Sequence, residues 1–228
     1  MRHVFRLMLQ LTVLSFCVMT AARAADTAYV VAYVEALPAE EGKAAALLGE
    51  FARETRKGAG NVQFLVLRRV GQPEQFAILG AWADEPARLA YTESAQTRAF
   101  QERLRPLLRA PYDERPYGAL EVGTGAAAGG QGSLYVLTHV DIIGKMLKEG
   151  IEAATQLAQA SRSEKGNQRF DLLTLAGRPN HVTIVEAWSS REAMTVHWGV
   201  GHTKAYREKY HPMSGSLYDE RFYQPLGN

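Results

Sequence analysis

The chain of 228 residues contains a single cysteine, and neither basic nor acidic residues predominate among its charges. One cysteine excludes an internal disulfide and any cysteine-rich zinc or iron–sulfur site. The balance of 26 basic and 24 acidic residues lacks the polybasic signature of proteins that bind phosphate backbones, so no nucleic acid partner is predicted. A hydrophobic fraction of 46% excludes a disordered chain, and the length predicts one large domain or two small ones.

Motifs that bind nucleotides or build common hydrolytic sites are also missing. The sequence has no Gly-x-Gly-x-x-Gly, Gly-Lys-Ser/Thr, His-Glu-x-x-His or Gly-x-Ser-x-Gly segment. Flavin and nicotinamide cofactors are therefore not predicted. No compact spacing of ligand residues indicates zinc, so the sequence predicts neither a cofactor nor a metal site.

Residues 1–24 have the three-part pattern of a secretory signal peptide. Arg2 and Arg6 precede an apolar stretch at 7–20, which is followed by the small residues Ala22 and Ala24 around Arg23. The apolar stretch has about 14 residues, fewer than the ~20 that span a bilayer, which disfavours the alternative of an uncleaved anchor. We expect cleavage after Ala24, a periplasmic or secreted protein, and no stable membrane span in the mature chain.

The rest of the chain contains one unit twice. Residues 29–117 align with residues 135–223 without a gap when the chain is shifted by 106 positions. This register matches Trp82 with Trp188, and it matches Tyr-Asp-Glu-Arg at 112–115 with the same four residues at 218–221. We therefore predict domains at 27–121 and 133–226, joined by a Gly- and Ala-rich linker at 122–132.

Each copy has the apolar periodicity of the same elements in the same order. Strands are predicted at 29–36, 62–70, 75–82 and 112–120, and again at 134–142, 168–176, 181–188 and 217–224. One helix follows the first strand, and a second helical region, at 85–108 and 191–213, is broken near residue 94 and near residues 199–201. The order βαββαβ predicts an α+β fold of two tandem ferredoxin-like units.

A single ferredoxin-like unit leaves one apolar face of its sheet uncovered. Two units can bury these faces against each other, so we expect an intramolecular dimeric α/β barrel. The tandem would then be a covalent pseudo-dimer. The sequence leaves its further self-association open.

A short set of motifs in the second copy resembles the antibiotic biosynthesis monooxygenase family. The segment Val185-Glu186-Ala187-Trp188 looks like the strand of that family that ends in Glu-x-Trp, and His197 and His202 look like its helical His-x-x-x-x-His. The turn with Gly166 and Asn167 is also similar. The resemblance, which includes quinol-monooxygenase-like members, implies a cofactor-independent monooxygenase that oxidises a small, electron-rich aromatic of the quinol or polyphenol type with O2.

The histidines are distributed unevenly between the copies. Five remain after signal removal, all in the second copy: His139, His181, His197, His202 and His211. The matched residues of the first copy are Tyr33, Gln75, Tyr91, Gln96 and Arg105, and Gly80 matches Glu186. This distribution predicts one working pocket, in the second copy, beside a degenerate first copy.

Three residues of the second copy are candidate catalytic groups. His197 is the preferred base, because an imidazole titrates near neutral pH, and His202 and Glu186 would hold substrate oxygens or tune that base. On a regular helix, positions 197 and 202 diverge too far to meet one metal, but the predicted break leaves their geometry open. Glu186 could instead be an ion pair with Arg169 or Lys165.

Four more residues are candidate substrate contacts: Trp188, Asn167, His139 and Phe170. We expect Trp188, Phe170 and Ile184 to line an apolar barrel that holds a flat ligand, and His139 to point into that barrel. Alternatively, Trp188 is core packing, since Trp82 matches it, and Asn167 is a turn residue.

Two other functions remain open from the sequence. A non-catalytic periplasmic binding or stress-related protein could keep the barrel and lose the reaction. A haem-binding barrel is less favoured, because Arg207 stands nineteen residues after Trp188, where haem-degrading relatives carry histidine.

Overall fold

The computed structural model describes residues 27–123, 130 and 132–227. The predicted signal peptide at 1–24 lies outside the described residues, as do residues 124–129 and 131 of the predicted linker. The first copy contains β1 (Ala28–Glu35), α1 (Glu41–Thr55), β2 (Asn61–Arg69), β3 (Gln75–Trp82), α2 (Glu85–Thr92), α3 (Ala95–Leu104) and β4 (Asp113–Glu121). The second contains β5 (Leu134–Asp141), α4 (Leu147–Ser161), β6 (Asn167–Leu175), β7 (Arg178–Trp188), α5 (Arg191–Gly199), α6 (Gly201–Tyr210) and β8 (Asp219–Pro225).

The predicted fold is confirmed in both copies, including the division of the second helical region. In the first copy, the Ser94 hydroxyl accepts a hydrogen bond from the Thr97 N–H and caps α3, as serine does at helix N-termini. In the second copy, Val200 has an extended backbone and separates α5 from α6. Among the described residues, no helix is both long and apolar enough to cross a membrane.

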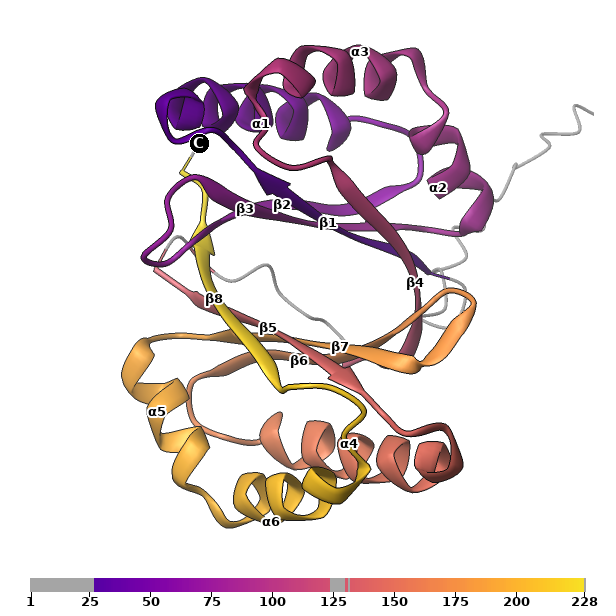
Figure 1. Cartoon of the computed structure of the whole chain (residues 1–228), viewed down its shortest axis with the longest axis vertical. Helices are drawn as coiled ribbons and strands as arrows, with labels where there is room; N and C mark the ends of the chain where they lie inside the picture. Colours follow the sequence, from indigo (N-terminus) through magenta and orange to yellow (C-terminus); the bar gives the residue numbers. More distant parts are fainter. Residues whose placement is uncertain (1–26, 124–129, 131, 228) are drawn as a thin grey trace, which may run out of the picture.

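The eight strands close into one barrel in the order β1-β3-β2-β8-β5-β7-β6-β4, in which β4 returns to pair with β1. The last strand of each copy joins the two copies. β4 also pairs with β6, and β8 pairs with both β5 and β2. Figure 1 shows the barrel between two helical layers, with α1–α3 on one side and α4–α6 on the other. Each copy therefore supplies four adjacent strands, one half of the barrel, and the halves meet where β4 pairs with β6 and β8 pairs with β2.

Alternate side chains of each strand enter different cores. In β7, Val185 and Ala187 belong to the barrel interior, whereas Ile184 and Trp188 pack beneath the helices of the second copy with Phe170. The prediction that these three residues line the barrel is therefore wrong. Both faces of the sheet are apolar and buried, so alternation alone does not show which face is inside.

The barrel interior is a packed core with one histidine in it. Tyr117, Tyr135 and Tyr223 fill it and are each at most 5% exposed. His139 points into this interior, as predicted: its Nε2 lies 2.7 Å from the Tyr33 hydroxyl, and its Nδ1 lies 3.2 Å from Thr183 Oγ1. Burial first, and then the charge of a nearby arginine, lowers the pKa of His139 to about 4.

The pKa of His139 predicts a loss of stability in acid. Between pH 6.5 and 4 the unfolded chain binds a proton at this residue and the folded protein does not, so the free energy of unfolding falls as the pH falls through this window. Over the whole window this loss of stability amounts to roughly 3 kcal/mol. A His139→Gln variant should lack this contribution to the acid loss, so urea unfolding of both proteins at pH 7 and pH 4.5 should show a smaller acid loss for the variant. Equal acid losses would contradict the assignment.

Candidate active site in the second copy

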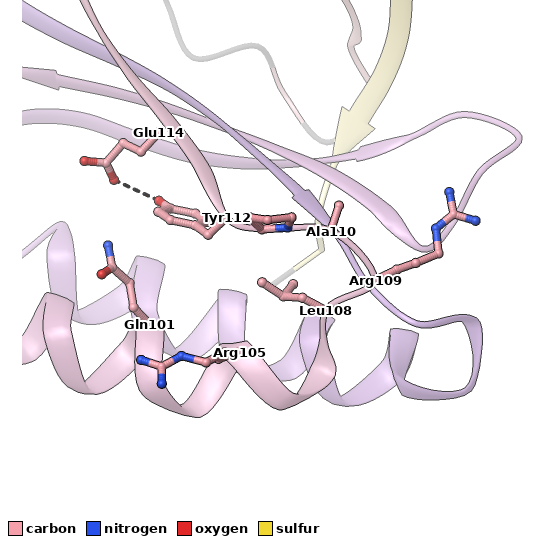
Figure 2. Close-up of a pocket in the computed structure, with 8 residues that line it drawn as sticks. Gln101, Arg105, Leu108, Arg109, Ala110, Tyr112 and Glu114 are labelled. Carbon is pink, nitrogen blue, oxygen red and sulfur yellow. Dashed lines mark hydrogen bonds between the residues drawn. The ribbon is translucent and has the colours of Figure 1, made fainter.

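Each copy has a cleft between its last helix, the following loop and its last strand. In the first copy the cleft encloses about 670 Å³, and its lining includes Gln101, Arg105, Tyr112 and Glu114. Figure 2 shows the Tyr112 hydroxyl pointing at the Glu114 carboxylate, to which it donates a hydrogen bond of 2.9 Å.

The second copy has a cleft of about 600 Å³ at the matching place. Its lining includes Arg207, His211, Tyr218 and Glu220, which stand 106 positions after those four residues of the first copy. Both copies therefore keep a cavity, and one working pocket in the second copy stays a prediction about the chemistry of the two clefts. The two copies differ in the chemistry beside their clefts.

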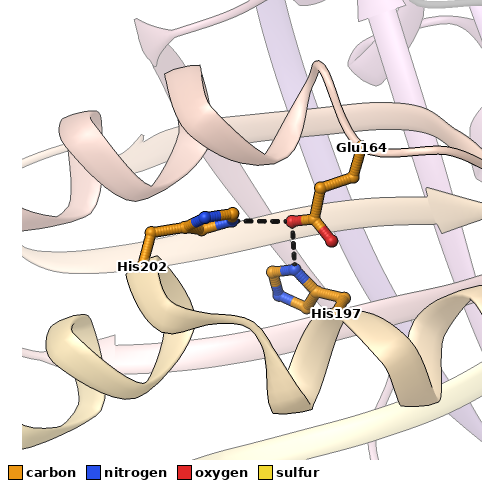
Figure 3. A group of neighbouring side chains, drawn as sticks. All are labelled: Glu164, His197 and His202. Carbon is orange, nitrogen blue, oxygen red and sulfur yellow. Dashed lines mark hydrogen bonds and ion pairs between the residues drawn. The ribbon is translucent and has the colours of Figure 1, made fainter.

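A cluster of two histidines and one carboxylate lies under the helices of the second copy. His197 Nδ1 and His202 Nε2 each lie 2.7 Å from the same oxygen of Glu164, Oε1, and each ring can donate an N–H to it. Figure 3 shows both rings turned toward this carboxylate. We call these three residues the Glu164 cluster.

Two local features of the chain build the Glu164 cluster. The interruption between α5 and α6 at Val200 turns His202 back toward His197, which a continuous helix would not do. Glu164 lies in the turn before β6, where Gly166 has a φ of +88° and a Cβ atom would come within 2.6 Å of Ala193 in α5. Glycine therefore lets the turn pack against α5 and brings Glu164 to His197. Sequence analysis missed Glu164, although the turn that holds it was identified.

Glu186 is the buried carboxylate of this site, with 4% of its surface exposed. Its Oε2 accepts a hydrogen bond of 2.8 Å from Trp188 Nε1 and lies 4.0 Å from His197 Nε2. Burial raises the pKa of Glu186 to about 8, which outweighs the opposing hydrogen bond from Trp188. The alternative ion pair with Arg169 is wrong, because Arg169 binds Asp171, and the described residues show no ion pair between Glu186 and Lys165.

His197 connects Glu186 with the Glu164 cluster. It is 3% exposed, and its ring centroid lies 4.8 Å from that of Trp188 and 5.6 Å from that of Phe170. Burial lowers its pKa, so the ring is neutral near pH 7, although the hydrogen bond to Glu164 opposes this shift. A neutral ring that donates from Nδ1 to Glu164 keeps Nε2, the atom on the Glu186 side, as a proton acceptor.

Charges that line the second cleft reach Glu186. The carboxylate of Glu220 raises the pKa of Glu186 and the guanidinium of Arg207 lowers it, and both residues line the cleft. The Tyr206 side chain is 4% exposed, and its hydroxyl has no hydrogen-bond partner in the described part of the chain. Burial raises the pKa of Tyr206, and Tyr210 and Glu186 add to this rise. Tyr206 is therefore a further polar group of this site that sequence analysis did not identify.

Two predicted contacts lie elsewhere. Asn167 is the first residue of β6, and its side-chain amide donates to the backbone carbonyl of Arg169 at 3.2 Å. His139 lies in the barrel interior, on the other side of the sheet from Glu186. The structure thus brings together Glu186, His197, Trp188 and Phe170, adds His202 through Glu164, and leaves Asn167 and His139 apart from them.

The first copy has aromatic packing where the second has acid and base. Tyr91 replaces His197, and its ring lies 4.4 Å from that of Trp82. Gly80 replaces Glu186, and a Cβ atom there would lie 2.4 Å from the Trp82 ring. In the first copy the Trp82 indole therefore covers Gly80, a position with no room for a side chain. In the second copy the Trp188 indole instead donates a hydrogen bond to the side chain of Glu186.

The close contact between Gly80 and Trp82 predicts that adding one methyl group at position 80 destabilises the fold. A Gly80→Ala substitution should lower the free energy of unfolding by about 1–3 kcal/mol, because the methyl group overlaps the buried Trp82 ring. Gly118→Ala in β4 is the matched control, since its Cβ atom would have its nearest neighbour, Thr174, at 3.9 Å. Urea unfolding should leave this control within about 0.5 kcal/mol of wild type. Similar costs for the two variants would contradict the packing argument.

A barrel of two ferredoxin-like units, with an acid–base centre under one helical layer, defines a tandem member of the dimeric α/β-barrel class. The chain belongs to the antibiotic biosynthesis monooxygenase family, whose family model matches residues 27–103 and 134–209. A Bacillus subtilis protein named "Putative monooxygenase YcnE" is 28% identical over 82 residues, which are 36% of this chain and 86% of that protein.

Two solved structures have the same fold across nearly the whole chain. A "Putative monooxygenase" from Fusobacterium nucleatum aligns with a TM-score of 0.80 and 14% identity, covering 89% of this chain and 94% of its own. Another from Lactobacillus acidophilus aligns with a TM-score of 0.73 and 13% identity, covering 89% of this chain and 95% of its own. At these identities the likeness shows the fold.

Proposed function

We propose that this protein is an exported monooxygenase that oxidises an electron-rich aromatic, of the quinol or polyphenol type, with O2 at the cleft of its second copy. Membership of the family supports the monooxygenase class. The observation that carries the proposal is the buried chain Glu186–His197–Glu164, a base whose ring is oriented by one carboxylate and faces another, which the charges of the cleft residues Arg207 and Glu220 reach.

The Glu186–His197 pair would take the phenolic proton of the substrate. His197 accepts it at Nε2 while Glu164 holds the opposite nitrogen, and Glu164 therefore acts as a positioning residue. The phenolate gives an electron to O2 more readily than the phenol does, and a carbon–oxygen bond then forms at the activated ring carbon. One oxygen atom enters the product, and the other leaves as water with the two hydrogens that the substrate loses. The substrate thus supplies all four electrons that reduce O2.

The first copy would contribute the other half of the barrel and no base. Its matching positions hold Gly80 and Tyr91, and the Tyr91 hydroxyl is too weak an acid–base group at neutral pH to replace His197. Its cleft could hold an aromatic ligand without reacting with it. One active centre per chain is therefore expected.

The pattern of residues 1–24 supports export. Mass spectrometry of the protein recovered from its native cells should find a mature N-terminus at Ala25. An intact N-terminus would contradict cleavage after Ala24.

An oxygen electrode tests the reaction directly. Purified protein is mixed with a panel of quinols and polyphenols, and the proposal expects consumption of one O2 per substrate without accumulation of hydrogen peroxide. Saturable binding of the aromatics without oxygen consumption would overturn the catalytic proposal in favour of a binding protein. A Soret band after addition of haem, again without turnover of quinols, would favour the haem-binding alternative.

A further inference from the structure

The Glu164 cluster has the composition of a metal site. Its three ligand atoms, one carboxylate oxygen and two imidazole nitrogens, all lie within 4.8 Å of one another. We propose that the Glu164 cluster binds one divalent first-row transition metal ion of the Zn²⁺ class, through the Glu164 carboxylate, His197 Nδ1 and His202 Nε2. Two imidazoles and a carboxylate suit Zn²⁺, Co²⁺ and Ni²⁺, and three protein ligands leave a coordination position open to water.

The geometry requires little movement. Metal–ligand bonds of about 2.0–2.2 Å place neighbouring ligand atoms roughly 3–3.5 Å apart, whereas here both nitrogens lie 2.7 Å from Glu164 Oε1 and all three atoms lie within 4.8 Å of one another. The oxygen of Glu164 is already 2.7 Å from both nitrogens, so the ion mainly has to separate them slightly and draw the two rings together. The His202 side chain is 33% exposed and is free to make most of this adjustment, whereas that of His197, at 4%, is held in place.

The surroundings of the cluster also suit an ion. Ligating histidines usually donate to a carboxylate or carbonyl from their other ring nitrogen, and Glu186 Oε2 lies on that side of His197, 4.0 Å from Nε2 and beyond hydrogen-bond distance. Exposure rises from His197 through Glu164, whose side chain is 12% exposed, to His202, so an ion can enter from the His202 side. The first copy has Gly58, Tyr91 and Gln96 at the matching positions, and one site per chain is therefore expected.

Binding of the ion would regulate the proposed reaction. A neutral imidazole carries one proton, so coordination at His197 Nδ1 moves that proton to Nε2 and removes the acceptor that faces Glu186. The ion would therefore inhibit oxygen consumption, and EDTA would restore it. This consequence rests on the proposed function, whereas binding of the ion does not.

Cobalt provides a spectroscopic test that needs no turnover. Purified protein, treated with EDTA and dialysed, is titrated with Co²⁺, and the visible absorption of bound Co²⁺ is followed and then displaced with Zn²⁺. We expect saturation at one ion per chain. His202→Gln and Glu164→Gln should each weaken binding at least about 10-fold. His211→Gln is the matched control, since it removes an exposed histidine of the same copy outside the cluster.

The outcomes separate clearly. A saturable cobalt spectrum that His202→Gln weakens and His211→Gln preserves supports the site, provided that circular dichroism shows both variants to be folded. Absence of a saturable spectrum, or equal binding by wild type and His202→Gln, overturns it. Because binding is measured without substrate, a failed oxygen assay leaves either result intact.

Discussion

A His197→Gln variant is expected to consume oxygen about 10²–10⁴-fold more slowly than wild type with any quinol that wild type oxidises, because this is the usual contribution of a positioned general base. Glutamine approximates the reach of the side chain and can still donate to Glu164, but it accepts no proton near neutral pH. The loss should therefore appear in kcat, while the KM for the aromatic changes little. Initial rates of oxygen uptake in buffer that contains EDTA measure both.

The first copy provides the matched control for this variant. Tyr91 stands at the position of His197, and Tyr91→Phe removes its only ionisable atom while keeping the aromatic packing against Trp82. Oxygen uptake by Tyr91→Phe should equal that of wild type if the second copy holds the active centre. A His197→Gln rate within about threefold of wild type would contradict the role of His197, as would an equal loss in the two variants.

Glu164 should behave differently from His197. Glu164→Gln keeps a hydrogen-bond acceptor beside Nδ1 and loses the negative charge that stabilises the protonated ring. The variant should retain partial activity, and the pH profile of kcat should move to lower pH because a less basic His197 stays deprotonated, and so able to accept a proton, further into acid. Loss of activity without any change in that profile would indicate a merely structural role.

Much of the fold could be predicted because the sequence contains two independent copies of one pattern. The prediction of a strand such as β3 or β7 has two lines of support, its own apolar residues and the matching residues 106 positions away. The breaks between the paired helices followed from the same comparison, since serine in one copy and glycines in the other stand in the same region. The pairing of β4 with β6 and of β8 with β2 between the copies could not be predicted, because strand pairing depends on contacts distant in sequence.

The site was only partly predictable for a physical reason. His197, His202 and Glu186 were identifiable because ionisable groups stand among apolar neighbours in one copy only. Glu164 lies in a surface turn 33 residues before His197, where a glutamate is ordinary, and only folding brings it to the two rings. The choice of sheet face failed because strands with helices on one face and a barrel core on the other are apolar on both.

The buried ion pair between Arg169 and Asp171 was not predicted from the sequence either. It connects the second copy with the first. Asp171 is fully buried and accepts hydrogen bonds from Arg169 Nε at 2.6 Å and from the Gly123 backbone N–H at 2.9 Å. Arg169 also donates to Gln63 Oε1 at 2.7 Å, so the pair reaches the first copy through Arg169 and the predicted linker through Asp171. Two residues apart on one strand, they lie on the same face, opposite to that of Phe170.

Asp171→Ala is expected to lower the free energy of unfolding by about 3–5 kcal/mol, because it leaves the charge of Arg169 buried without its partner. The exposed pair Asp113–Arg115, with side chains 43% and 41% exposed, is the matched control, and Asp113→Ala should cost less than about 1 kcal/mol. Replacing both buried partners by apolar residues, in Arg169→Met with Asp171→Leu, should recover most of the loss because no buried charge remains. Urea unfolding at pH 7 measures all three variants. A double variant as unstable as Asp171→Ala would show that the hydrogen bonds to Gln63 and Gly123, rather than the unpaired charge, carry the stability of this contact.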